Sequence, residues 1–147
     1  MRLTRYTDYA MRVLLYLASK PDDRLSSIGE IARGYGISQN HLMKVVNDLV
    51  RAGYIESVRG RFGGIRLARH ADTINVGQVV RHTEDDFDLV DCDGCVIAPA
   101  CGLTGVLHEA TRAFLAVLDS YSLADVQAGR NDLLRLFGIP GEVAPVA

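Results

Sequence analysis

The sequence contains only three cysteines, no internal repeat and no apolar run near the length of a membrane span. A membrane-crossing helix needs about 20 consecutive apolar residues, so none is expected here. The first residues lead directly into a helical pattern instead of a signal peptide. No Ser/His/Asp set, phosphate-binding loop or convincing pair of carboxylates stands out, so the chain is not expected to be an enzyme. We therefore expect a chain of 147 residues that buries its own core and stays in the cytoplasm, where thiols remain reduced.

The three cysteines, Cys92, Cys95 and Cys101, lie close together in an acidic, loop-like segment. An odd number of cysteines cannot pair completely into disulfides, whereas their C-x2-C-x5-C spacing can bring three thiolates to one inorganic centre. Spacing alone leaves three interpretations open: an iron-sulfur cluster, a structural zinc site with His108 or an aspartate as fourth ligand, and redox thiols without a metal.

Charge is distributed unevenly along the chain. Residues 1–70 contain 12 Lys and Arg against 6 Asp and Glu, which gives +6, and residues 71–147 contain 4 against 12, which gives −8. Together the two halves account for the net charge of −2. A positive first half suits a polyanion such as nucleic acid, while the acidic second half would repel one.

The first half has the pattern of a helix-turn-helix. Residues 6–19 and 28–35 place apolar side chains at helical spacing, and Ser26 or Ser27 caps the second of these helices. A glycine-containing turn follows, after which Ser38 caps a longer helix. A short helix, a tight turn and a second helix with a polar outer face are typical of helix-turn-helix architecture.

A β-hairpin is expected directly after these helices. Residues 54–58 and 65–68 have the composition of two strands, and the turn between them contains three glycines. Glycine allows positive φ angles and a close approach of the backbone to a ligand. The hairpin therefore predicts a wing with Arg59 and Arg61 at its tip.

The second half is predicted to be helical on both sides of the cysteine loop. Helices are expected over residues 76–83 and 103–118, and a last helix, capped by Ser122, from residue 123 to about 137. The 103–118 helix has more apolar surface than a peripheral helix needs, and self-association along it into a twofold dimer is the economical explanation.

The predicted fold is mainly α with a small β-hairpin wing, a winged helix-turn-helix followed by a long dimerisation helix. Residues 1–70 would form the DNA-binding domain, and residues 71–101 the connecting helix and cysteine loop. Residues 102–137 would hold the dimerisation and C-terminal helices, and residues 138–147 a flexible tail.

The outer face of the 38–51 helix is polar. On its own, this indicates only that the face is exposed to solvent. The arginine-tipped hairpin and the positive first half favour contact with DNA instead. Gln39 and Asn40 carry amides that suit adenine edges in the major groove, and an arginine at the wing suits a narrow A·T-rich minor groove. The predicted DNA-binding residues are Ser38, Gln39, Asn40, His41, Lys44, Arg59 and Arg61.

Several short motifs, taken together, resemble one known family. They are Thr7-Asp-Tyr, Gly36-Ile-Ser-Gln-Asn-His-Leu, Arg51-Ala-Gly-Tyr, Val58-Arg-Gly-Arg-Phe-Gly-Gly-Ile-Arg-Leu, Pro99-Ala-Cys and Leu118-Asp-Ser-Tyr-Ser-Leu-Ala-Asp-Val. In this combination the chain is similar to the dimeric winged-helix repressors with iron-sulfur clusters, whose types include NsrR, IscR and RirA. The resemblance is strongest to the nitric-oxide-responsive NsrR type.

The resemblance implies a cluster, of the 4Fe-4S type in preference to 2Fe-2S, bound by the three cysteines. In NsrR-type proteins a carboxylate from the first helix of the partner subunit completes the ligand set, and Asp8 matches that position. By residue type alone, Asp8 would instead be a first-turn carboxylate that stabilises the helix dipole. IscR-type proteins use a histidine three residues past the last cysteine, where this chain has Thr104.

One feature departs from the NsrR pattern, because Cys92 and Cys95 are closer together than the usual first pair. Bacterial ferredoxins show that a C-x2-C pair can serve two irons of one cubane. The resemblance thus still implies a cluster on these cysteines.

The implied function is transcriptional repression by a homodimer on a pseudo-palindromic operator, with release of the DNA when nitric oxide nitrosylates the cluster. One alternative is an iron- or redox-responsive repressor of the RirA or IscR type. Another is a metal-binding scaffold or electron-transfer protein with no role on DNA, which would bind DNA no better than nonspecifically.

Overall fold

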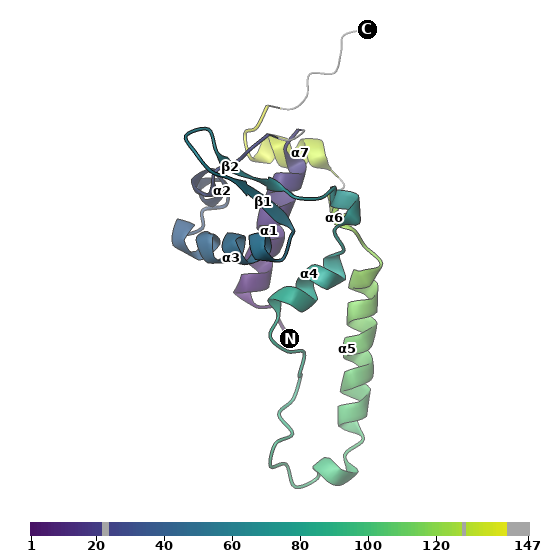
Figure 1. Cartoon of the computed structure of the whole chain (residues 1–147). Coiled ribbons are helices and arrows are strands. Elements are labelled where there is room, and N and C mark those ends of the chain that lie inside the picture. Colours follow the sequence, from purple (N-terminus) through teal and green to yellow (C-terminus); the bar gives the residue numbers. More distant parts are fainter. Residues whose placement is uncertain (22–23, 128, 141–147) are drawn as a thin grey trace.

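The computed structural model of the chain describes residues 1–21, 24–127 and 129–140. Within this part the chain is mainly helical, with a two-stranded antiparallel hairpin (Figure 1). The elements in chain order are α1 (Arg5–Ser19), α2 (Ile28–Tyr35), α3 (Gln39–Arg51), β1 (Ile55–Val58), β2 (Gly64–Leu67), a 3-10 turn (Ala71–Thr73), α4 (Val76–Thr83), a second 3-10 turn (Ala98–Ala100), α5 (Leu103–Asp119), α6 (Leu123–Val126) and α7 (Arg130–Leu136).

Helix α1 forms the centre of the hydrophobic core. Its N-cap, Thr4, accepts a hydrogen bond from the backbone N–H of Thr7, as expected of a threonine at this position. Ala10, Val13 and Leu14 recur at helical spacing and are fully buried. They pack in one cluster with buried residues of α2, α3 and the wing, so a single core supports the whole first half.

The predicted helix-turn-helix is confirmed in α2 and α3. Ser27 caps α2 by accepting from the N–H of Glu30 at 3.0 Å, and Gly36 ends it in the left-handed conformation at φ 68°. The buried face of α3 consists of Leu42, Val45, Val46 and Leu49. Ser38 precedes α3 at the N-cap position, but its side chain makes no capping hydrogen bond, which corrects the predicted cap.

Strands β1 and β2 form the predicted wing. They are antiparallel, with Ile55 opposite Leu67 and Val58 opposite Gly64. The segment before α2 adds a short third contact, because Ser26 and Ile65 exchange both backbone hydrogen bonds, at 2.9 and 2.8 Å. The wing is therefore tied to the helix-turn-helix through its second strand.

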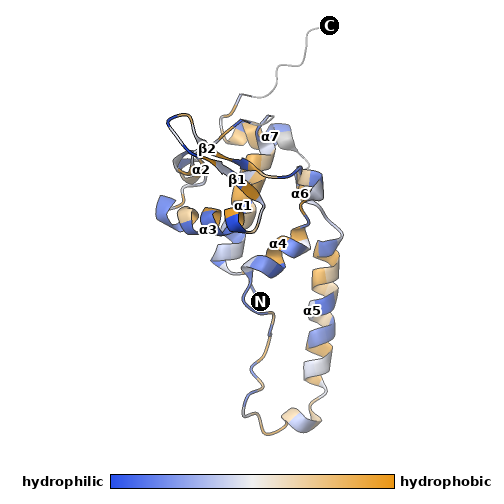
Figure 2. Cartoon of the chain, viewed as in Figure 1, coloured by the Kyte–Doolittle hydropathy of each residue, from blue (hydrophilic) through white to orange (hydrophobic). Residues whose placement is uncertain are grey.

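Helices α4 and α5 stand beside each other at the start of the second half (Figure 1). Arg81 pairs with Asp119 across them, and Gly77 lies so close to Asp119 that a Cβ would find no space. The segment between them, residues 84–102, extends away from the winged helix, and α5 begins at its far end and runs back (Figure 1). No residue of α5 is buried in this chain, and Figure 2 shows apolar residues along its length.

The predicted last helix, residues 123 to 137, is two helices in the structure, α6 and α7. Gly129 adopts φ 103°, a left-handed conformation that interrupts a helix. Phe137 packs at the end of α7 against Tyr16 and Tyr35, with ring centroids 4.8 and 5.0 Å apart. Within the described residues no helix has the length and apolar character needed to cross a bilayer. Residues 141–147 of the predicted tail lie outside the described part.

Candidate metal centre and nucleic-acid interface

The backbone of the cysteine loop forms consecutive tight turns. The N–H of Cys95 donates to the carbonyl of Cys92 at 3.2 Å, and that of Cys101 donates to Ala98 at 3.4 Å. Gly94 adopts φ 73° inside the first turn, a conformation that glycine takes without strain. All three cysteines are free thiols, with Cys92 and Cys101 half-buried and Cys95 exposed.

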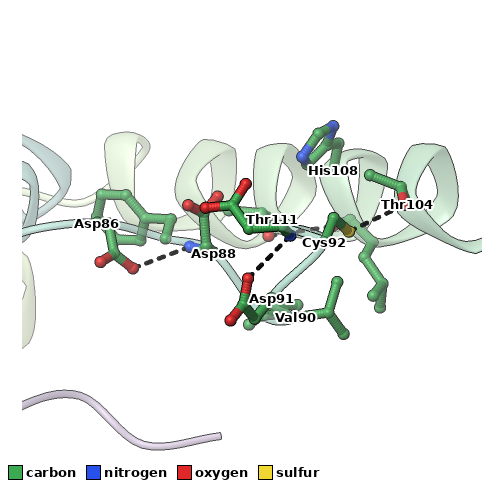
Figure 3. Close-up of a pocket in the computed structure, with 12 residues that line it drawn as sticks. Asp86, Asp88, Val90, Asp91, Cys92, Thr104, His108 and Thr111 are labelled. Carbon is green, nitrogen blue, oxygen red and sulfur yellow. Dashed lines mark hydrogen bonds between the residues drawn. The ribbon is translucent and has the colours of Figure 1, made fainter. Parts of the chain in front are cut away.

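Thr104, in the first turn of α5, connects two of the cysteines. Its hydroxyl oxygen lies 3.5 Å from the sulfur of Cys92 (Figure 3). The backbone N–H groups of Leu103 and Thr104, followed by the Thr104 hydroxyl, lower the pKa of Cys101. The start of α5 therefore favours the thiolate of Cys101, which is the form of cysteine that can bind a metal.

The structure only partly gathers the predicted ligands. Cys92 and Cys101 share Thr104 as a neighbour, while Cys95 has its side chain in solvent. In the part of the chain that the structure describes, no three His, Cys, Asp or Glu side chains lie close enough to hold a metal ion. Three accessible sulfurs on one loop, one of them biased towards thiolate, nevertheless form a donor set whose chemistry fits an iron-sulfur cluster.

A cavity of about 470 Å³ lies against this loop and α5. Its wall includes Cys92, Thr104, His108 and several acidic residues of the loop, among them Asp88 and Asp91 (Figure 3). His108 thus has an exposed ring on the same side of α5 as Cys92, although no ligand cluster forms there among the described residues.

Asp8 lies in the first turn of α1 and is paired within its own chain. Its carboxylate accepts a hydrogen bond from Nε of Arg12, one helical turn later, at 3.0 Å. The Asp8 side chain is 47% exposed, so it remains accessible from outside. Among the described residues its carboxylate is bonded to Arg12 and not to the cysteine loop, so a cluster-binding role would require a second copy.

The start of the cysteine loop is hydrogen-bonded to the start of α1. Glu84, the C-cap of α4, accepts from the backbone N–H of Thr4 at 2.7 Å and from the hydroxyls of Thr4 and Thr7 at 2.9 and 2.5 Å. The Thr7 hydroxyl also lies 2.8 Å from that of Thr83. Burial raises the pKa of Glu84, but the hydrogen bonds from Thr7 and Thr4 outweigh it and hold the pKa below its usual range.

A second junction connects α4 with α3. Oδ2 of Asp48 accepts a hydrogen bond from the hydroxyl of Tyr6 at 2.9 Å and lies 3.0 Å from Nε2 of His82. Burial, followed by the hydrogen bond to Asp48, raises the pKa of Tyr6 to about 12. The sequence analysis did not find this junction, because no local signal connects residues 34 positions apart.

The predicted DNA-binding residues lie on two adjoining surfaces. The side chains on the outer face of α3 and at the wing turn are all exposed: Ser38, Gln39, Asn40, His41, Lys44, Arg59 and Arg61. A cavity of about 450 Å³ has walls from α3, including Asn47 and Arg51, and from the wing, including Ser57 and Arg59. The two surfaces therefore meet at the base of the wing. The sequence analysis did not single out Phe62, which is exposed at the wing tip.

Three comparisons place the chain among known regulators. Residues 3–129 match the Rrf2 family model, described as an iron-dependent transcriptional regulator. Over 141 residues the chain is 52% identical to the HTH-type transcriptional regulator NsrR of Bacillus subtilis (strain 168), covering 92% of this chain and 97% of that protein. The fold is similar to that of T. potens IscR, with a TM-score of 0.72, 26% identity and 87% of each chain covered. It is also similar to CymR, the global cysteine regulator of B. subtilis, with a TM-score of 0.68, 25% identity, and 87% of this chain and 97% of that one covered.

Proposed function

Because the chain belongs to the Rrf2 family of transcriptional regulators and is not an enzyme, we propose that it is a nitric-oxide-sensing repressor that releases its operator when its iron-sulfur cluster is nitrosylated. One structural observation carries this proposal. The loop that holds every cysteine begins at residues bonded both to α1 and to the recognition helix α3. A chemical change in the loop therefore has direct routes to the DNA-binding surface.

In this proposal Cys92, Cys95 and Cys101 hold a cluster, of the 4Fe-4S type in preference to 2Fe-2S, and Asp8 of the partner subunit supplies the fourth ligand. When bound, the cluster supplies iron sites that react with nitric oxide. The first turn of α5 stabilises the thiolate of Cys101, and Thr104 lies beside Cys92. An oxygen ligand among sulfurs is the weakest of the set, and it is the one that would connect the two subunits.

Helix α5 supports a homodimer. A helix of 17 residues with none of them buried leaves much of its apolar side uncovered. Leu103, Val106 and Val117 are 57%, 60% and 59% exposed on it. Packing against the same helix of a second copy around a twofold axis would remove this surface from water.

The dimer would present two copies of α3 and of the wing to a pseudo-palindromic operator. Two recognition helices of such a dimer lie about one DNA turn apart, roughly 34 Å. Gln39 and Asn40 would read base edges in the major groove, and Arg59 or Arg61 would enter the minor groove. The positive charge of residues 1–70 would attract the phosphates, in the cytoplasm where DNA and reduced thiols coexist.

The chain's own residues would transmit the signal. Glu84 fixes the loop to Thr4 and Thr7 at the start of α1, and His82 contacts Asp48 in α3. A movement of the loop would shift these hydrogen-bonded partners and with them the angle of α3. The paired recognition helices would then lose the spacing that the operator requires.

The description of the family as iron-dependent favours a second candidate, a regulator that responds to iron supply or redox state through loss of the cluster. The two candidates share the ligands and the DNA surface. They differ in whether nitric oxide alone, at constant iron content, releases the DNA.

The experiment is an absorption spectrum and a DNA titration of anaerobically purified protein, before and after stoichiometric nitric oxide. We expect a coloured protein whose spectrum changes at once, with loss of operator affinity while iron is retained. Loss of affinity only when iron is removed would favour the iron-responsive candidate. A colourless protein that contains zinc would contradict both.

A further inference from the structure

The turn at the tip of the wing presents an aromatic side chain to solvent. The N–H of Gly63 donates to the carbonyl of Gly60 at 3.0 Å, which places Arg61 and Phe62 at the two central positions of the turn. Phe62 is 87% exposed. The other phenylalanines of the chain, Phe87, Phe114 and Phe137, are all partly buried. Among the phenylalanines, all of which lie in the described residues, so large an exposure is thus particular to Phe62.

The turn holds this position through close backbone packing. A Cβ at Gly63 would lie 2.9 Å from the carbonyl carbon of Arg59, and one at Gly64 would lie 2.8 Å from the carbonyl oxygen of Ser26. Gly60 adopts φ 111°, which a side chain would strain. The glycines therefore fix the path of the turn, and the Phe62 ring is displayed at a defined place.

The surroundings of Phe62 are cationic. Arg59 and Arg61 are exposed beside it, and the guanidinium carbon of Arg61 lies 5.7 Å from the centre of the Phe62 ring. The nearest paired acid on the wing, Glu56, is bonded to Arg66 in the strands at 2.9 Å. Two exposed arginines and an apolar ring at the wing tip suit nucleic acid. The phosphates can bind the arginines, and the bases can stack on the ring.

We propose that Phe62 is an apolar wedge that enters the minor groove of the operator with the wing arginines and inserts partly between two stacked base pairs. This inference rests on the proposed DNA-binding function and adds a specificity determinant to it. Wedges of this kind unstack one step and bend the duplex. Pyrimidine–purine steps unstack most readily, so Phe62 would favour such a step at each wing.

The test uses the anaerobically purified protein and a duplex that the wild-type protein selects from a random-sequence pool. 2-Aminopurine is placed in turn at each adenine of this duplex, since its fluorescence rises when it is unstacked. Binding to the selected duplex and to an unrelated duplex is measured for wild type, Phe62→Ala, Phe62→Leu and the charge control Arg59→Ala. Thermal unfolding of each variant checks the fold, which truncation of a largely exposed side chain should leave intact.

We expect wild type to raise the fluorescence at one step under each wing. Phe62→Ala should abolish the rise and weaken binding to the selected duplex by about tenfold, with unchanged binding to the unrelated duplex. Phe62→Leu should keep part of the rise because it retains an apolar wedge. Arg59→Ala should weaken binding to both duplexes and keep the rise.

Two results separate this inference from the function on which it rests. Equal affinity and equal fluorescence for Phe62→Ala and wild type on the selected duplex would overturn the wedge while sequence-specific binding stands. Failure of the wild-type protein to select any duplex over the unrelated one would overturn the proposed function itself, and the wedge with it.

Discussion

Asp48 in the recognition helix α3 and His82 in the last turn of α4 are joined side chain to side chain, with Oδ2 and Nε2 3.0 Å apart. His82 lies two residues before the cysteine loop begins at Glu84, and Asp48 follows the predicted DNA-reading residues on the same helix. The same carboxylate also accepts a hydrogen bond from Tyr6 of α1. One acid thus connects the helix before the candidate sensor with the helix that would read DNA.

Removing this acid should weaken both stability and signalling. We expect Asp48→Ala to lower the free energy of unfolding by about 1 to 2 kcal/mol, because it leaves the partly buried Tyr6 hydroxyl without its acceptor. It should also reduce the ratio of operator affinities before and after nitric oxide. His82→Ala is the matched variant, since it keeps the Tyr6 bond and removes the contact with Asp48, together with the ring contact between His82 and Tyr54. An unchanged affinity ratio in both variants would show that the junction has a structural role alone.

The three cysteines should all be needed for the cluster. We expect each of Cys92→Ala, Cys95→Ala and Cys101→Ala to purify with little iron and sulfide, because loss of one thiolate leaves a cluster with two weak positions. The variants should remain folded and dimeric, since no cysteine belongs to the hydrophobic core. Iron and sulfide analysis measures the cluster content of each variant, and analytical sedimentation measures its oligomeric state. A variant with full iron and sulfide content would remove that cysteine from the ligand set.

Asp8 is expected to act across the dimer. Asp8→Ala should keep most of the cluster but change its reaction rate with nitric oxide and weaken its effect on DNA binding, as expected of one oxygen ligand. Arg12→Ala is the control, because it breaks the 3.0 Å ion pair and keeps the carboxylate. If spectra, rates and operator affinity are the same for Asp8→Ala and wild type, Asp8 only stabilises the start of α1.

Substitutions on the outer face of α3 should distinguish residues that contact bases from residues that contact phosphates. Gln39→Ala and Asn40→Ala should each reduce the preference for operator over scrambled duplex by about 1 to 3 kcal/mol, if they make bidentate base contacts. Lys44→Ala should lower affinity for both duplexes and reduce the salt dependence by about one ion. Titrations at several salt concentrations distinguish these effects. Equal wild-type affinity for operator and scrambled duplex, with cluster and dimer confirmed, would favour a metal-binding scaffold.

The contact between Glu84 and α1 should make the free energy of unfolding depend on pH. The pKa of Glu84 is lower in the folded chain than its ordinary value of 4.5, so the ionised form stabilises the fold. This contribution is present above pH 4.5 and is lost as the pH falls through the folded pKa. Glu84→Gln should be less stable than wild type near neutral pH and should lose less stability on acidification. Unfolding curves at several pH values test this, and parallel curves for the two proteins would exclude the contribution.

Local patterns in the sequence predicted the helix-turn-helix and the wing well. Helix α2 has the predicted bounds, and α3 ends where the pattern ended, because serine, glycine and apolar spacing act within a few residues. The last helix was predicted as continuous, since its apolar spacing persists through the glycine that interrupts it. Gly129 adopts a left-handed conformation there, and Phe137 packs against Tyr16 and Tyr35.

Some features of the candidate site could likewise be predicted from the sequence, and others could not. The sequence by itself determined which side chains could act as ligands, the spacing of Cys92, Cys95 and Cys101, and the polar face of α3, because these depend on residue identity and short-range periodicity. Only the tertiary structure decided that Glu84 bonds to Thr4, 80 residues earlier, and that Asp48 meets His82. Such contacts form when the core brings distant helices together, so no local pattern encodes them. For residues 103–118 the sequence predicted an excess of apolar surface, and the structure adds that the described part of the chain buries no residue of α5.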